Sequence, residues 1–150
     1  MEPLIALHPA RFEPLALLQS WHELLARQSG GPAAAEASFV GRARGRGGHG
    51  EPLTGLELEH YPGMTERCLD SQARELMGEH GVIAVMVHHR VGLVEPGDAI
   101  VLVAVVADRR GPAQRCCQAL LERLKHDAPF WKREHGLDGH SRWLAGNTAL

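Results

Sequence analysis

The sequence predicts a mixed fold in which helices alternate with strands, and three observations lead to this prediction. Two runs rich in β-branched residues, 82–87 and 99–107, are separated by the turn signal Glu95-Pro96-Gly97-Asp98. Three other segments carry apolar residues at the spacing of one helix face. The segment 56–61 alternates as a strand with one wet face does. We expect 82–87 and 99–107 to pair as a hairpin, with 99–107 as a central strand because it has no polar residue.

The first predicted helix has Pro14 in its first turn and ends at the sequence Ser29-Gly30-Gly31-Pro32. A strand over 35–40 follows it. The second predicted helix begins after Pro62-Gly63, which ends the strand over 56–61. Its apolar residues are Met64, Cys68, Ala73, Leu76 and Met77, and we expect Gly78 and Gly81 to close it.

Length and composition limit the possible functions. The 150 residues suit one domain, residues 1–150, that buries about 70% of its unfolded surface. A net charge of −2 argues against a general nucleic-acid or membrane-surface role, because no basic excess is available. The chain starts without a basic leader region and has no apolar stretch as long as a membrane span. Three cysteines, two of them adjacent, do not suggest a disulfide framework, so we expect a cytoplasmic protein.

The lysines are the most informative residues for chemistry. Of sixteen Lys and Arg residues only Lys125 and Lys132 are lysines. A lysine in dry surroundings can give up its proton, which arginine essentially cannot do. A third helix should begin at Pro112 and end near Asp127, because Pro129 disfavours helix at the residue before it. Lys125 then lies in the last helical turn beside the apolar stripe, and Lys132 lies on an extended segment. Chance placement of two lysines is the alternative.

The segment 41–50 is rich in glycine and arginine. Residues 45–50 formally match the dinucleotide fingerprint G-x-G-x-x-G, but a helix should follow that motif, and here Glu51-Pro52 and a strand follow. Two alternatives are an RNA-binding Arg-Gly segment and a mobile loop solvated by its arginines. Arg42 and Arg44 adjoin the predicted strand and are better placed to hold an anion.

A further candidate anion site is Asp108-Arg109-Arg110, between the central strand and the third helix. The carboxyl end of a strand beside a helix N-terminus suits phosphate or carboxylate, although a salt-bridged strand end is an equally good interpretation. The histidines and cysteines show no zinc spacing, so we expect no metal ligands. Cys116 and Cys117 should be small core residues, with redox sensing as the alternative.

Four motifs in this order resemble the catalytic (large) subunit family of molybdopterin synthase. They are Phe39-Val40-Gly41-Arg42-Ala43-Arg44, Leu58-Glu59-His60-Tyr61-Pro62-Gly63-Met64, His89-Arg90-Val91-Gly92, and the run from Leu124-Lys125 to Pro129-Phe130-Trp131-Lys132-Arg133-Glu134. The resemblance extends over about residues 4–145. It implies an α/β hammerhead-type α+β fold, with a mainly antiparallel sheet and about three helices.

The resemblance also implies an activity and partners. In that family a small ubiquitin-like sulfur-carrier subunit inserts its C-terminal Gly-Gly thiocarboxylate, and two sulfurs pass to cyclic pyranopterin monophosphate to form the dithiolene of molybdopterin. The assembly implied is a homodimer that binds two carriers, a heterotetramer, and no cofactor is needed because sulfur arrives on the partner. By motif, Lys125 and Lys132 would be catalytic. The implied substrate-binding residues are Arg42, Ala43, Arg44, Asp108, Arg109, Lys125, Lys132, Arg133 and Glu134.

One residue departs from the family pattern. Asp108 stands where the family usually has histidine, and a carboxylate there repels phosphate unless an arginine neutralises it. The tail 144–150 also has no basic residue and is expected to be mobile. A divergent, non-catalytic binding module for the ubiquitin-like carrier is therefore the alternative function.

Overall fold

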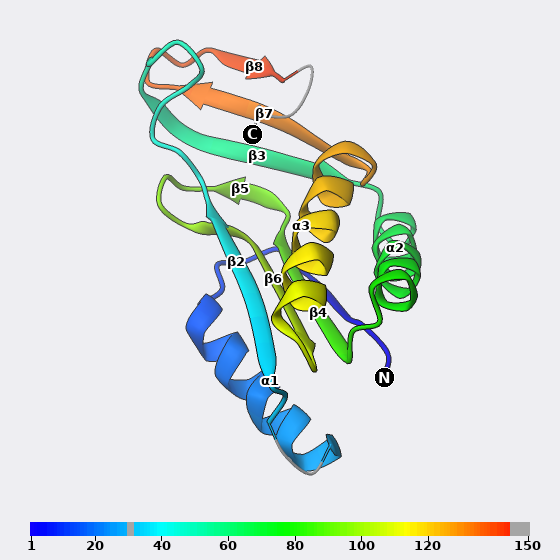
Figure 1. Ribbon diagram of the computed structural model, residues 1–150. Helices are drawn as coiled ribbons and strands as arrows, with labels where there is room; N and C mark the ends of the chain where they lie inside the picture. Colours follow the sequence, from blue (N-terminus) through cyan, green and yellow to red (C-terminus); the bar gives the residue numbers. More distant parts are fainter. Residues whose placement is uncertain (30–31, 145–150) are drawn as a thin grey trace.

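Two four-stranded sheets form the framework of the protein (Figure 1). The computed structural model describes residues 1–29 and 32–144. In the first sheet the strand order is β1-β4-β6-β2, with β1 parallel to β4 and the other neighbours antiparallel. Its strands are β1 (Leu4–His8), β4 (Ala84–Arg90), β6 (Ala99–Ala107) and β2 (Ala35–Arg42).

Strand β6 is one of the two inner strands of the first sheet, so the prediction of a central strand is confirmed. It pairs with β4 on one side, where Val103 lies opposite Val87, and with β2 on the other. Residues 102–107 are buried because helices cover both faces of the sheet. The predicted antiparallel pairing of β4 with β6 is confirmed. The connection between them is more than a turn, however, because it contains a short strand, β5 (Gly92–Val94), that joins the second sheet.

Three helices pack on the first sheet. Helices α2 (Met64–His80) and α3 (Arg110–His126) cover one face, and α1 (Pro14–Ser29) covers the other (Figure 1). Gly81 closes α2 in the left-handed conformation, with φ of 62°, whereas Gly78 lies inside the helix. Helix α3 begins two residues before Pro112, and it ends before Asp127 as predicted. Cys116 and Cys117 lie in the core beneath α3, and burial raises the pKa of each thiol to about 11.

The second sheet is wholly antiparallel, in the order β5-β3-β7-β8. Its other strands are β3 (Leu53–His60), β7 (Phe130–Gly136) and β8 (Ser141–Trp143). A small core of Ala43, Leu58 and Val94 fills its inner side. The α+β class and the three helices are confirmed; β1, β5 and β8 were not predicted from the sequence.

No helix in the described parts of the chain is both long and apolar enough to span a membrane. Two sequence expectations, the helix stop at Gly30-Gly31 and the tail beyond Leu144, lie outside the described residues.

Replacing Leu102 by alanine should destabilise the fold without reaching the cavity described below. Leu102 is fully buried in β6 and packs on the α1 side of the sheet. Removal of its side chain should lower the free energy of unfolding by about 2–5 kcal/mol, because the cavity left behind collapses only in part. Urea denaturation measures the change. Leu15→Ala is the matched control, since Leu15 is 81% exposed; equal losses in both variants would contradict this account of the core.

Candidate functional site

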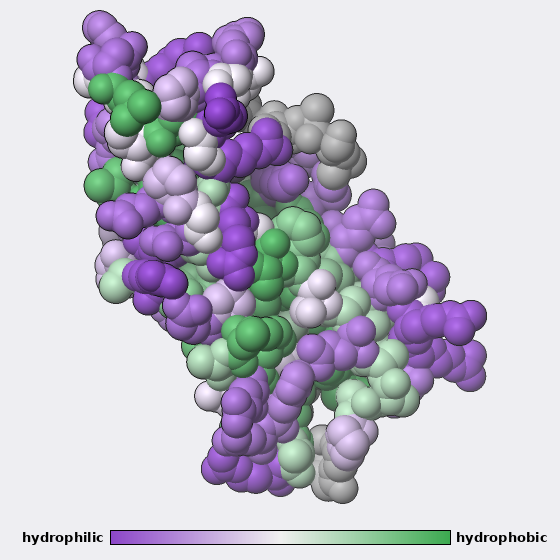
Figure 2. Space-filling model, turned by 90° about the vertical axis from the view of Figure 1, so that its left-hand side faces the viewer, coloured by the Kyte–Doolittle hydropathy of each residue, from purple (hydrophilic) through white to green (hydrophobic). Residues whose placement is uncertain are grey.

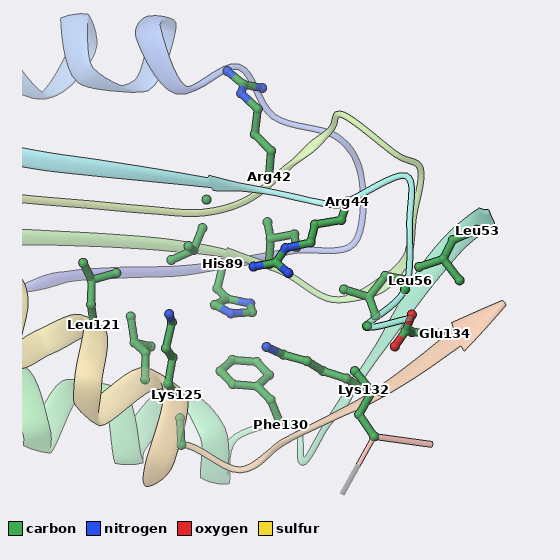
Figure 3. A pocket seen from close by; sticks show the side chains of 18 of the residues that line it. Arg42, Arg44, Leu53, Leu56, His89, Leu121, Lys125, Phe130, Lys132 and Glu134 are labelled. Carbon is green, nitrogen blue, oxygen red and sulfur yellow. The ribbon is translucent and has the colours of Figure 1, made fainter. Parts of the chain in front are cut away.

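A cavity of about 580 Å³ lies where the two sheets meet the C-terminal end of α3. One wall comes from the end of β2 and the glycine-rich loop, and the opposite wall comes from α3 and β7 (Figure 3). On one face of the molecule, hydrophobic side chains gather in a central band between hydrophilic surfaces (Figure 2). The polar side chains that line the cavity belong to Arg42, Arg44, Arg46, His89, Lys125, Lys132, Glu134 and Arg142.

The end of α3 before Pro129 brings the two lysines together. Helix α3 ends at His126, and after Pro129 the chain enters β7. Lys125 reaches the cavity from the last helical turn, and Lys132 reaches it from the strand (Figure 3). Successive strand residues face opposite sides, so Phe130, Lys132 and Glu134 share the cavity wall. The predicted convergence of the lysines on one site is therefore present in the fold.

The arginines at the end of β2 take different positions. Arg44 extends toward the lysines, whereas Arg42 points away from them (Figure 3) and donates a hydrogen bond of 3.3 Å to the carbonyl of Gly97. Ala43, between them, is buried against Leu58 and Val94 and does not line the cavity.

The cavity carries a strong positive charge. Six of its described lining residues are cationic, and Glu134 is the one acid among them. Burial lowers the pKa of Lys132 below the ordinary lysine value, and the charges of Lys125 and Arg44 lower it further. Anions are therefore favoured in the cavity, and Lys132 releases a proton more readily than an exposed lysine does.

The glycine-rich loop forms part of the cavity wall. Arg46 pairs with Pro52 in an isolated bridge, and Arg46, Gly47 and Gly48 line the cavity. Gly47 lies so close to β7 that an added Cβ would stand 2.9 Å from the carboxylate of Glu134. Arg142 of β8 lies 3.6 Å from Glu51 of the loop and 3.9 Å from Glu134. The alternative of a freely solvated loop does not describe this packing.

Arg133 faces the other side of the second sheet. Its guanidinium donates hydrogen bonds to Glu57 and lies 4.8 Å from the ring centre of Trp143. Hydrogen bonds from Arg133 and His135 hold the pKa of Glu57 below its usual range. Arg133 is therefore part of a structural ion pair in this chain and does not line the cavity.

Asp108 and Arg109 lie at the opposite end of α3 from Lys125. Both are exposed, and Arg109 is the residue that precedes the helix. The 17 residues of α3 extend about 25 Å at 1.5 Å per residue. Neither side chain lines the cavity of its own chain, and their role in substrate binding stays a prediction.

Three of the polar side chains that line the cavity were not predicted as site residues: Arg46, His89 and Arg142. Arg142 lies on a strand with no distinct local signal. The sequence clue for His89 is a polar residue at the end of the apolar run that forms β4. No group of three or more histidine, cysteine, aspartate or glutamate side chains in the described residues could hold a metal ion.

Comparison with known proteins gives the family. The model of the MoaE protein family matches residues 11–127. The molybdopterin synthase catalytic subunit of Ralstonia nicotianae is 42% identical over 123 residues, 81% of this chain and 69% of that protein. The same subunit of Caulobacter vibrioides is 38% identical over 141 residues, 94% of this chain and 88% of that protein.

The solved structures agree with the sequence relatives. The structure of the molybdopterin biosynthesis MoaE protein from Burkholderia ambifaria superposes with a TM-score of 0.77 at 36% identity, covering 99% of this chain and 92% of that one. The match extends over the elements that carry the lysines and the arginine wall. The resemblance found in the sequence motifs is thus confirmed, and the chain belongs to the MoaE protein family, which includes molybdopterin synthase catalytic subunits.

Proposed function

We propose that this protein transfers sulfur from the C-terminal thiocarboxylate of a small ubiquitin-like carrier subunit to cyclic pyranopterin monophosphate, which yields the dithiolene of molybdopterin. The observation that carries the proposal is the convergence of Lys125, Lys132 and Arg44 on one cationic cavity. Family membership supports the same reaction, since curated relatives are molybdopterin synthase catalytic subunits.

Each sulfur transfer has two steps in this proposal. The thiocarboxylate sulfur attacks a carbon of the precursor, so that a C–S bond forms, a C–O bond breaks and the departing oxygen takes a proton. Water then hydrolyses the acyl–sulfur bond, which frees the carrier as a carboxylate and leaves the sulfur on the pterin. Negative charge builds up on the departing oxygen, and fixed cations in a dry cavity stabilise it. The dithiolene requires two such transfers.

The lysines fit the proton transfers and the arginines fit the anion. A lysine whose pKa is lowered is a better proton donor near neutral pH than an ordinary one, and burial lowers the pKa of Lys132. Lys125 lies on the same wall as Lys132 and would protonate the departing oxygen. Arg44 can bind a phosphate through two parallel hydrogen bonds but is a poor proton donor.

The carrier brings the sulfur, so the proposed reaction needs no resident metal or organic cofactor. The relatives are named as catalytic subunits, which supports a second kind of subunit in the assembly. An extended Gly-Gly tail suits this cavity, because glycine allows close backbone approach to the apolar walls formed by Leu121, Leu124 and Val101. We propose a homodimer that binds two carriers, in the cytoplasm.

We propose that Asp108 and Arg109 act in the cavity of the second protomer. Because α3 separates them from the cavity of their own chain, they can reach substrate only in the cavity of a partner chain. Arg109 would then add a cation to that cavity, and Asp108 would need an arginine to neutralise it.

A non-catalytic binding module for the carrier is the second candidate, supported by Asp108 in place of the family's usual histidine. A reconstituted assay with thiocarboxylated carrier and cyclic pyranopterin monophosphate separates the two. Molybdopterin formation supports the enzyme, and carrier binding without product supports the module.

Lys125→Ala should abolish molybdopterin formation in that assay while folding and carrier binding remain. Lys125→Arg should fail almost as completely, since arginine supplies charge without a labile proton. Single-turnover product formation is the measurement, with circular dichroism as the folding control. Near-normal turnover in the arginine variant would reduce Lys125 to an electrostatic role.

The lowered pKa of Lys132 predicts how precursor binding depends on pH. The Lys132 ammonium loses its proton at a lower pH than an ordinary lysine, so its attraction for phosphate is present below that pKa and lost as pH rises through it. Loss of one charge-assisted bond should weaken precursor affinity about tenfold or more. Lys132→Ala should be weak at every pH, with a milder loss of turnover than Lys125→Ala. Lys132→Arg is the control that keeps its charge; identical pH curves for Lys132→Arg and the wild type would contradict the assignment.

Mixing two variants, at a precursor concentration at which neither alone forms product, tests whether partner chains complete each cavity. Homodimers of Lys125→Ala and of Arg109→Ala are unfolded, mixed and refolded together. If one chain supplies Lys125 and the other Arg109, each mixed dimer has one intact site, and activity should return to roughly a quarter of wild type from random pairing. If both residues served the same chain's cavity, no mixed dimer would have an intact site and activity would stay absent. Refolded wild type is the control for recovery.

A further inference from the structure

The side chains that line the cavity are rich in hydrogen-bond donors and poor in acceptors. The arginines and the protonated lysines in its wall can only donate hydrogen bonds. Among the described lining side chains, the nitrogen and oxygen acceptors belong to Glu134 and His89. Glu134 lies beside Gly47 and Arg142, so it is already close to a cation. His89 is therefore the free acceptor near the two lysines (Figure 3).

The hydrogen bond of His89 fixes which ring nitrogen accepts. Its Nδ1 lies 2.7 Å from the carbonyl oxygen of Arg90. A carbonyl oxygen can only accept, so Nδ1 carries the hydrogen and donates it. Burial lowers the pKa of His89 to about 4, and the charge of Lys132 also lowers it. The ring is therefore neutral at physiological pH, and its Nε2 has a lone pair that no residue within 1–29 or 32–144 engages with a hydrogen bond.

Packing holds the ring of His89 in place. It is 6% exposed at the end of β4 and stacks on Phe130, with ring centres 4.0 Å apart and planes within 13°. The ionisable groups that face it are Lys132 and His60 from the second sheet, with Lys125 and Arg44 on the same cavity. None of these groups supplies an acceptor like a carboxylate, and a second imidazole, that of His60, does not line the cavity.

We propose that Nε2 of His89 accepts a hydrogen bond from an N–H group of the pterin ring and so positions the precursor and determines specificity for it. The inference rests on the proposed function. The reduced pterin of the precursor carries ring N–H groups and an exocyclic amine. The phosphate of the precursor would pair with the arginines and lysines of the wall. Without His89, the acceptor left among the described lining side chains is Glu134, which already lies 3.9 Å from Arg142. A pterin N–H beside the two lysines would then face donor side chains, and a buried unpaired donor weakens binding.

Two substitutions separate the two nitrogens of His89. His89→Asn keeps an amide donor near the position of Nδ1, for the bond to Arg90, and removes the acceptor at Nε2. His89→Gln places an amide near the position of Nε2, where its oxygen can accept. His88→Asn is the matched control, because His88 is equally buried on the same strand but faces His8 on the α1 side.

Calorimetry with cyclic pyranopterin monophosphate alone, without carrier, gives the first readout. Precursor affinity should fall about tenfold in His89→Asn, the value of one neutral hydrogen bond, and should recover in part in His89→Gln. His88→Asn should bind the precursor as the wild type does. In the reconstituted assay the KM for precursor should rise in His89→Asn more than kcat falls.

The second readout needs no variant to fold. In ¹⁵N spectra of the wild-type protein, His89 should show the Nδ1–H tautomer, and its Nε2 resonance should shift when precursor binds. An unshifted Nε2 would overturn the proposal, and so would equal precursor affinity in wild type and His89→Asn. A variant that loses carrier affinity but keeps precursor affinity would also overturn it, because the donor would then be the carrier tail. If the wild type neither binds precursor nor forms product, the proposed function fails and the role of His89 fails with it.

Discussion

Like charges held close together are the constraint on which the site depends. Lys125, Lys132 and Arg44 share a cavity in which burial already opposes charge, as the lowered pKa of Lys132 shows. Such a cluster repels itself, so the rest of the fold must hold it in place. A bound anion relieves the repulsion, and ligand binding should therefore stabilise the folded chain.

The scaffold holds the cluster by using rigid elements from both sheets. Strand β6 is buried on both faces, which fixes β4 and β2 on either side of it. Helix α3 packs on the same sheet and presents Lys125 from its last turn, while β7 belongs to the second sheet. Pro129 lies between α3 and β7 and disfavours helix at the residue before it. The helix therefore ends there, and a helix on the first sheet and a strand of the second sheet meet at one cavity.

Local signals in the sequence predicted much of this arrangement. The proline at the start of α1, Gly81 at the end of α2, the apolar run of β6 and the end of α3 were all visible along the chain. Lys125 and Lys132 were predicted as site residues because lysine is rare in this chain, and Arg44 because it adjoins a predicted strand. Arg46 and Arg142 were not, because the docking of the glycine-rich loop on β7 and β8 is a contact between segments far apart in sequence. Arg109 was predicted as an anion-binding residue from its place between the central strand and the third helix and from the family resemblance, yet the length of α3 keeps it from the cavity of its own chain.

In the proposed role of His89, the contrast between many donor side chains and one free acceptor would give the cavity its selectivity. Cations attract any small anion, so charge alone does not distinguish one phosphate compound from another. A buried acceptor does, because a ligand without a matching N–H leaves it unpaired at a cost of about 1–3 kcal/mol. His89 meets this requirement only while neutral, and its burial beside Lys132 keeps it so. In the proposed role of His89, the positive charge that would attract the phosphate also adds to burial in keeping the imidazole neutral, which is the form that can accept a pterin N–H.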